Sequence, residues 1–244
     1  MTRLLRDPIA RIALALWAGT AAVYFLPGVP ADFLVRMGDR YNTLPLWAWA
    51  AAGCIYGVAA VGDRSERRFW WLQAVSFWAL LAIEVPWALA NGNNSASWNV
   101  ASECCYFVYY LCQLLSVART RSARAAAIGV PVAVAAALSL MAVRGSALYD
   151  GAWPSYLSYL AFDLTMAIVF WRMRSGADAR WSGIYTGLAI TALLVFGTDV
   201  LDMLWYVGWI TMDSGTKADL LWTLPPLGYA LVSRFGREPV QLRG

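Results

Sequence analysis

Eight long apolar runs, separated by short polar connections, are the feature that most constrains this chain. They lie near residues 11–28, 44–61, 69–90, 98–117, 125–143, 155–173, 181–207 and 217–233. Each is long enough to cross a hydrocarbon layer roughly 30 Å thick as an α-helix. Charged residues make up 14% of the chain, against about 25% in a typical soluble domain. The sequence therefore predicts an all-α, polytopic membrane helix bundle with eight transmembrane helices.

The distribution of basic residues predicts the orientation of this bundle. If the N-terminus is cytoplasmic, the cytoplasmic segments hold 15 of the 19 Lys and Arg residues. They are Arg3, Arg6, Arg11, Arg64, Arg67, Arg68, Arg119, Arg121, Arg124, Arg172, Arg174, Arg180, Arg234, Arg237 and Arg243. Because basic residues concentrate in cytoplasmic loops, we expect both termini in the cytoplasm and a multi-pass protein of the bacterial inner membrane. Residues 1–234 would form the transmembrane domain, and 235–244 a cytoplasmic tail or the start of a linker.

Two local expectations follow from this arrangement. Residues 29–43 form the longest connection on the outer side and are predicted to be a loop. Pro225 and Pro226 fall inside the last predicted span, where proline removes a backbone hydrogen bond and kinks a helix. Such a kink would be either a place of movement toward the cytoplasm or a static bend.

Several function classes are disfavoured by composition. The net charge of +4 is divided among small clusters between the apolar runs, so it is a topology signal and predicts no nucleic-acid partner. The chain has no histidine and its four cysteines form no CxxC pair, which argues against a zinc or iron–sulfur site. We therefore expect no metal and no cofactor. Lys217 is the only lysine and lies at the end of a span, so a retinal Schiff base is not expected.

Acidic residues inside the predicted spans are candidates for function. A carboxylate at the centre of a transmembrane helix costs about 2.5–3.5 kcal/mol, so it normally faces the protein interior or a wet cavity. The acids concerned are Glu84, Glu103, Asp163, Asp199, Asp202 and, near the outer end of the last span, Asp219. They would either line a polar cavity open to the outside or form hydrogen bonds between helices.

Aromatic residues accompany these acids in the outer halves of the helices: Trp78, Trp87, Tyr106, Tyr109, Tyr110, Trp205, Tyr206 and Trp222. Aromatic rings beside carboxylates can enclose an organic cation or an amphipathic ligand, although packing and interfacial anchoring are an alternative role. The predicted ligand-binding set comprises Glu84, Trp87, Glu103, Tyr106, Tyr110, Asp163, Asp199, Asp202, Asp219 and Trp222. No catalytic residue is assigned.

Four stretches of the chain carry a resemblance to a known class of membrane regions. They are Arg67–Trp70 with Glu84–Trp87, then Ala101–Glu103 with Tyr106 and Tyr109–Tyr110, then Tyr159–Leu164, and finally Gly197–Asp202 with Ala218–Trp222 and Gly228–Ala230. In this pattern, over about residues 65–235, the chain resembles the multi-span N-terminal sensory regions of bacterial diguanylate cyclases (GGDEF), phosphodiesterases (EAL) and histidine kinases. It departs from them in having Glu103 where Asp is usual.

The resemblance implies a membrane-embedded sensory input module. Enzymatic activity within these residues is not expected, although the residues do not decide it. Membrane lipids, a small or lipid-like ligand entering from the periplasm or outer leaflet, and a cytoplasmic output domain or a homodimer partner would be its partners. Cyclic di-GMP signalling is one output that it implies. The residues alone leave two alternatives open: a small proton- or cation-coupled transporter, and a lipid-modifying membrane enzyme.

Overall fold

The computed structural model describes residues 6–90, 96–118, 129, 131–132, 153–206 and 208–234. Within these ranges the chain consists of helices, turns and short connections, and contains no strand. The prediction of an all-α fold is therefore confirmed for the described part of the chain. The predicted span near 125–143 lies outside it, apart from residues 129, 131 and 132.

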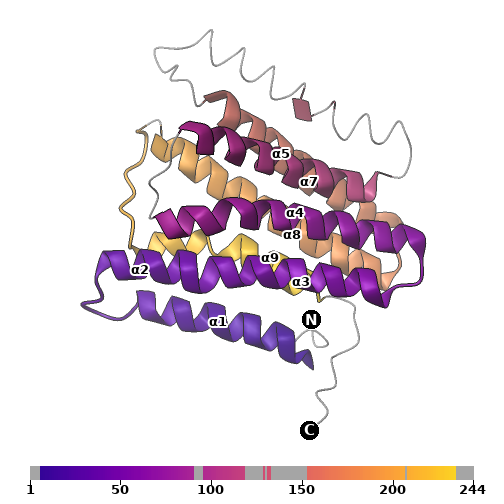
Figure 1. Ribbon diagram of the computed structural model, residues 1–244, viewed down its shortest axis with the longest axis horizontal. Helices are drawn as coiled ribbons and strands as arrows, with labels where there is room; N and C mark the ends of the chain where they lie inside the picture. The colour runs from indigo at the N-terminus through magenta and orange to yellow at the C-terminus, as the bar shows by residue number, and fades with distance from the viewer. Residues whose placement is uncertain are drawn as a thin grey trace.

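The helices run back and forth beside one another, as Figure 1 shows. In chain order they are α1 (Pro8–Tyr24), α2 (Ala31–Gly38), a π-helical turn (Asp39–Thr43), α3 (Leu44–Ala60), α4 (Arg64–Ala90), α5 (Ala96–Val117), α7 (Trp153–Met173), a 3₁₀ turn (Arg174–Gly176), α8 (Ala179–Tyr206), a second 3₁₀ turn (Lys217–Leu221) and α9 (Leu224–Val232). The largest core cluster joins side chains of α3, α4, α5, α7, α8 and α9.

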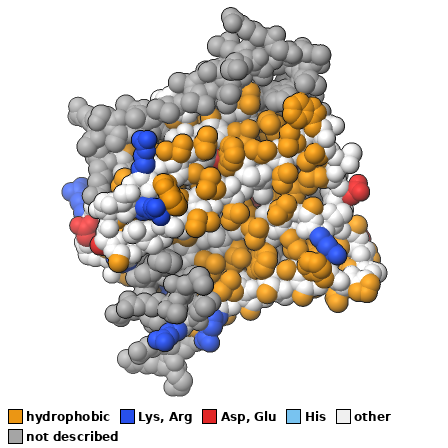
Figure 2. All heavy atoms as spheres, turned by 180° about the vertical axis from the view of Figure 1, so that it is seen from behind, with side chains coloured by type: hydrophobic (Ala, Val, Ile, Leu, Met, Phe, Trp, Pro, Cys, Tyr) orange, Lys and Arg blue, Asp and Glu red, His pale blue; other side chains and the backbone are white. Residues whose placement is uncertain are grey.

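Three described segments are long and apolar enough to cross a membrane: Ala31–Ala60, Arg64–Pro86 and Ala179–Trp205. By this criterion three segments qualify rather than eight, and they are compatible with a membrane location. Helix α1 is apolar but has 17 residues, so it is shorter than a full span by this criterion. Figure 2 shows one face of the molecule, on which hydrophobic side chains spread over the middle and charged ones lie mostly toward the margins.

The helices that begin at one end of the bundle are capped by aspartates. The Asp7 carboxylate accepts hydrogen bonds from the backbone N–H groups of residues 9 and 10, at 2.8 and 3.3 Å. Asp63 accepts from the N–H of Glu66 at 2.8 Å, and Asp178 from that of Trp181 at 2.9 Å. Each bond satisfies a donor that the first turn of a helix leaves without a partner. These caps fix where α1, α4 and α8 start.

Helix α9 is packed closely between α3 and α8, and glycines make this approach possible. A Cβ atom added to Gly53 of α3 would lie 2.2 Å from Ser233 Oγ. One added to Gly187 of α8 would lie 2.6 Å from Val232 Cγ2. Small residues let helix backbones approach each other in membrane bundles. The last helix is therefore held on two sides, with little space to move sideways near its C-terminal end.

Two local predictions were wrong. Residues 31–43 are helical and continue into α3, rather than forming a loop. Their polar side chains resemble loop composition, but several of them line a cavity at the end of the bundle. Pro225 and Pro226 lie in the first turn of α9 instead of kinking a helix at its middle. The first turn has no backbone acceptor for its N–H groups, so proline is tolerated there and helps to begin the helix.

Candidate ligand-binding site

A cavity of about 590 Å³ opens at the end of the bundle where α1, α4 and α8 finish. It is lined by the end of α1, the α2 and π-helical segment, the end of α4, the end of α8 and residues 212–223. Its lining residues are Tyr24, Asp32, Val35, Arg36, Gly38, Asp39, Arg40, Thr43, Ala88, Asp202, Trp205, Met212, Asp213, Ser214, Asp219, Trp222 and Thr223. The volume is that of a small-molecule site.

Acidic side chains outnumber basic ones in this lining. Five aspartates contribute to it, at positions 32, 39, 202, 213 and 219, against two arginines. Arg36 forms an ion pair with Asp32, four residues earlier on α2. Arg40 donates from Nε to the carbonyl oxygen of Ala88 at 2.9 Å, which ties the π-helical turn to the end of α4. Arg40 also acts on the charge of Asp39. Because five aspartates still outnumber two arginines, the cavity has a negative character that favours cations.

Three aromatic side chains share the cavity with these acids. Trp222 donates from Nε1 to Asp202 Oδ2 at 3.1 Å, so the indole and the carboxylate are held next to each other. The hydroxyl of Tyr24 donates to the carbonyl oxygen of Leu34 at 2.7 Å, which fixes the ring at the cavity wall. Trp205 lies one turn after Asp202 on α8 and is 52% exposed. A ring anchored beside a carboxylate and a second ring left exposed offer a cation both charge and π-faces.

The connection from α8 to α9 closes one side of the cavity and is shaped by Asp219. Its Oδ2 accepts a hydrogen bond from the N–H of Gly215 at 2.7 Å. Thr216 caps the following 3₁₀ turn, and Gly215 itself adopts φ +79°, a backbone region that favours glycine. Asp219 therefore has a structural role in this loop as well as a place in the cavity lining.

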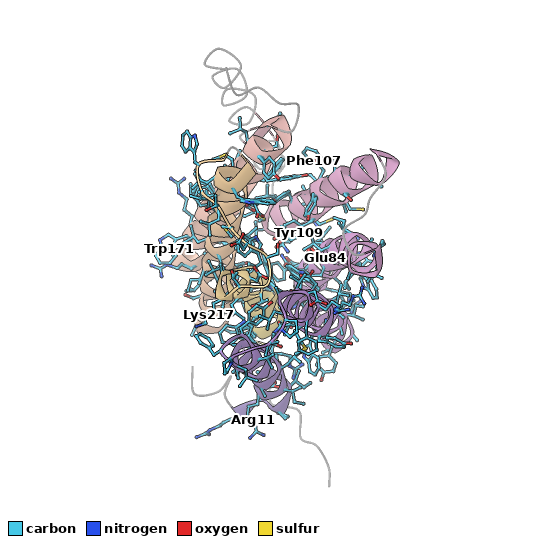
Figure 3. The ribbon with its side chains drawn as sticks, turned by 90° about the vertical axis from the view of Figure 1, so that its left-hand side faces the viewer. Arg11, Glu84, Phe107, Tyr109, Trp171 and Lys217 are labelled. Atoms are coloured by element: carbon cyan, nitrogen blue, oxygen red, sulfur yellow. The ribbon has the colours of Figure 1, made fainter. Side chains whose placement is uncertain are left out.

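A second group of acids lies deeper, around the ring of Tyr106 on α5. This side chain interacts electrostatically with Glu84 of α4, Glu103 of its own helix, and Asp199 and Asp202 of α8. The hydroxyl of Tyr159 on α7 donates to Glu103. Glu84 also interacts with Asp39 at the cavity wall. Figure 3 shows the labelled Glu84 and Tyr109 turned toward the interior of the bundle, whereas Trp171 points away from it.

Among the acids that the structure describes, Asp163 of α7 is the most deeply buried, at 0% exposed. The carboxyl of Asp199 on α8 and the hydroxyl of Tyr110 on α5 both face it. Tyr110 stacks on Phe162 with ring centroids 5.1 Å apart, so α5 and α7 are in contact at this level. Nearby, the hydroxyl groups of Tyr109 and Tyr229 are 2.6 Å apart and join α5 to α9.

The predicted site residues fall into these two groups. Asp202, Asp219 and Trp222 line the cavity, and Asp202 also belongs to the interior group around Tyr106. The interior group contains Glu84, Glu103, Tyr106, Tyr110, Asp163 and Asp199. Trp87 lies in α4, but its side chain is outside the described part of the structure.

The predicted set missed the wall formed by the α2 and π-helical segment. Tyr24, Asp32, Arg36, Asp39, Arg40 and Thr43 line the cavity but were not predicted. The signal that could have identified them is the density of charged residues between positions 32 and 40, in a segment read as a loop. Asp213 and Ser214, from the connection before α9, were missed for the same reason.

The geometry of the acids does not create a metal site within the described residues, where no group of three or more His, Cys, Asp or Glu side chains is placed to hold an ion. A scan against protein-family models, a search of curated proteins and a search of solved structures gave no match to this chain. The functional argument therefore depends on the cavity and the acids around it.

Proposed function

We propose that this chain is the membrane-embedded input module of a bacterial signalling protein, and that it binds a small organic cation in the cavity at the outer end of the bundle. The observation that carries the proposal is the lining of that cavity, where five aspartates and three aromatic rings surround about 590 Å³. Organic cations are recognised by carboxylates and by the faces of aromatic rings. The resemblance to bacterial sensory regions supports the role of an input module.

The arrangement we propose in the membrane has eight spans, with both chain ends on the cytoplasmic side of the inner membrane. The bias of arginine toward one set of connections supports it. So does the ion pair between Asp7, before α1, and Arg234, after α9, with 2.7 Å between Arg234 Nη2 and Asp7 Oδ2. This contact brings the beginning of the first helix and the end of the last one to the same end of the bundle, as an even number of spans requires.

Helix α9 is the proposed path of the signal. Trp222 and Thr223 line the cavity directly before α9 begins. Thr223 accepts a hydrogen bond at 2.8 Å from the Trp17 indole of α1. At its other end, α9 leads to Arg234 and the cytoplasmic side. A ligand that binds more tightly to one arrangement of this connection than to another would shift the population of the two.

Binding of matched probes tests the cavity. The purified full chain in lipid nanodiscs is titrated with choline and with its uncharged carbon isostere, dimethylbutanol, while tryptophan fluorescence is recorded. Choline is expected to bind and the isostere to bind more weakly. Asp202→Asn and Asp219→Asn, which keep an acceptor oxygen but remove charge, are each expected to weaken choline binding about threefold to tenfold.

Asp63→Asn is the matched control, because Asp63 caps α4 at the opposite end of the bundle. Its choline affinity is expected to equal that of the unmodified chain. Equal binding of choline and dimethylbutanol, or no effect of either cavity substitution, would refute the cation site. A reporter fused after Gly244 tests the topology, since the proposal requires a cytoplasmic signal.

A small proton-coupled transporter is the second candidate, favoured by the buried acids of the interior group. Asp163 in particular is fully buried, and neither of its carboxylate oxygens has a hydrogen-bond partner among the described residues. Uptake of labelled choline into proteoliposomes distinguishes the two functions. A pH gradient should drive accumulation by a transporter, whereas an input module would bind choline without accumulating it.

A further inference from the structure

The contact between Asp163 and Asp199 has a chemistry separate from that of the cavity. Asp163 is 0% exposed, and both of its oxygens lack a hydrogen-bond partner within the described residues. Buried polar groups are nearly always paired, because leaving one unpaired costs free energy. A fully buried carboxyl whose two oxygens lack a donor is unfavourable as a bare carboxylate, whereas a proton on it supplies a hydrogen bond.

The groups that face this carboxyl are acids and phenols. Asp199 faces it from α8 and Tyr110 from α5, while Tyr109 of α5 and Tyr229 of α9 interact with it from further away. Asp202, one turn after Asp199, adds a further acid. No ion pair of the described residues involves Asp163 or Asp199. The negative charge of two ionised carboxylates would thus be uncompensated.

Two carboxylates in contact cannot both stay ionised in a medium of low polarity, because each opposes the charge of the other. A bound cation, or one proton shared between the two groups, removes this electrostatic repulsion. Hard metal ions take several oxygen ligands, about six to eight for calcium, and the described residues contain no group of three or more His, Cys, Asp or Glu placed to hold an ion. A proton needs only the two carboxyl groups, and the Tyr110 hydroxyl can donate to the remaining oxygen.

We propose that Asp163 and Asp199 bind one exchangeable proton between them, as a carboxyl–carboxylate pair that links α7 to α8. The shared proton replaces one negative charge and forms the hydrogen bond that the oxygens of Asp163 otherwise lack. Asp202 lies on the same face of α8 as Asp199 and lines the cavity, so the pair exchanges its proton through that side. This proposal does not depend on the cation site.

Infrared spectroscopy of the full chain in nanodiscs at pH 7 tests the pair. A protonated carboxylic acid has a carbonyl stretch distinct from that of a carboxylate, and the band shifts when H₂O is replaced by D₂O. The unmodified chain is expected to show such a band. Asp163→Asn and Asp199→Asn are each expected to move it, and the double variant to lose it. Asp178→Asn, an exposed helix cap in which Asn still serves as the acceptor, is expected to leave it unchanged.

The single variants keep the proposal testable even if the double variant does not fold. A band that stays in place in both single variants belongs to another acid, such as Glu84, and overturns the proposal. So does the absence of any band in the unmodified chain. A band that appears only after sodium is replaced by potassium would overturn it in favour of a bound sodium ion. A shift in each single variant, with no dependence on sodium, supports it.

Discussion

The two ends of the bundle contain similar residue types and use them in opposite ways. At the end where α1 begins and α9 finishes, acids are paired with arginines. Arg234 contacts Asp7 at 2.7 Å, and Arg180 contacts Glu66 at 2.5 Å. At the other end, aspartates outnumber arginines around an open cavity of about 590 Å³.

This difference separates a structural role from the binding role that we propose. Both partners of the Asp7–Arg234 pair have side chains that are 3% exposed, so their charges are paired out of contact with solvent. The Arg36–Asp32 pair beside the cavity has side chains that are 49% and 72% exposed, and it remains in contact with solvent. Acids paired with arginines hold one end together, while an excess of aspartates and an exposed ring at the other end surround the cavity that we propose as the binding site.

The largest expected effect comes from breaking the buried pair. Asp7→Asn keeps an acceptor for the first turn of α1 but leaves the Arg234 charge buried without its partner. Such a loss costs about 3–5 kcal/mol, so the midpoint of thermal unfolding in detergent should fall strongly. Asp32→Asn is the counterpart at the cavity end, and an exposed pair of this kind contributes about 0–1 kcal/mol.

The comparison between the ends would fail if the two substitutions lowered the unfolding midpoint equally. It would also fail if Asp7→Asn did not lower the unfolding midpoint, because the Asp7–Arg234 pair would then not stabilise that end of the bundle. Arg234→Lys adds a further check, since lysine keeps the charge but cannot reproduce the two contacts at 2.7 and 3.1 Å that the guanidinium makes. Its expected effect lies between those of the two aspartate variants.

A smaller effect is expected in the loop that closes the cavity. A Cβ added to Gly215, at φ +79°, would lie 2.5 Å from the carbonyl oxygen of Ala31. Gly215→Ala therefore combines backbone strain with a clash against backbone, which we expect to cost about 2–3 kcal/mol and to weaken choline binding. Gly208→Ala is the matched control, because Gly208 has φ +74° but open space around it. Equal choline affinity in both variants would mean that this loop does not shape the site.

Much of the helical layout could be predicted from hydropathy. The runs near 44–61, 98–117 and 155–173 correspond closely to α3 (Leu44–Ala60), α5 (Ala96–Val117) and α7 (Trp153–Met173). Hydropathy failed where a helix lines a polar cavity, as at residues 31–43, and where an apolar stretch is divided, as at 217–233. In both cases the residue types suit the surroundings of the segment in the folded bundle, and hydropathy alone does not show those surroundings.

The site was only partly predictable for a related reason. The cost of a buried carboxylate points to acids such as Glu103 and Asp163 wherever they fall in apolar runs. Which of these acids meet depends on how each helix is rotated and packed, and single-sequence hydropathy carries no such information. The contact of Asp163 with Asp199 and the separate cavity around Asp202 could therefore be learned only from the structure.

Glu66 belongs to the end of the bundle where acids are paired with arginines. Glu66 accepts hydrogen bonds from Arg180 and, at 3.2 Å, from the Trp70 indole. Because the side chains of Arg180 and Glu66 are 37% and 14% exposed, we expect Glu66→Gln to cost about 1 kcal/mol, less than Asp7→Asn. Thermal unfolding measures it, with Asp178→Asn as a control at the same end. A loss of stability as large as that of Asp7→Asn would show that the burial of an ion pair does not determine how much the pair stabilises the protein.

The smallest expected effect lies between the two ends, at the contact of Tyr109 with Tyr229. Their hydroxyl groups are 2.6 Å apart and join α5 to α9, and both side chains are buried. Tyr109→Phe and Tyr229→Phe keep the packed rings but remove one hydroxyl each. Interhelical hydrogen bonds in membrane proteins average about 0.6 kcal/mol, so each variant should shift the unfolding midpoint slightly. In a double-mutant cycle the second substitution should then add almost nothing, because the bond is already lost. Fully additive losses would mean that the two hydroxyl groups act separately and that their hydrogen bond does not help to hold α9 against α5.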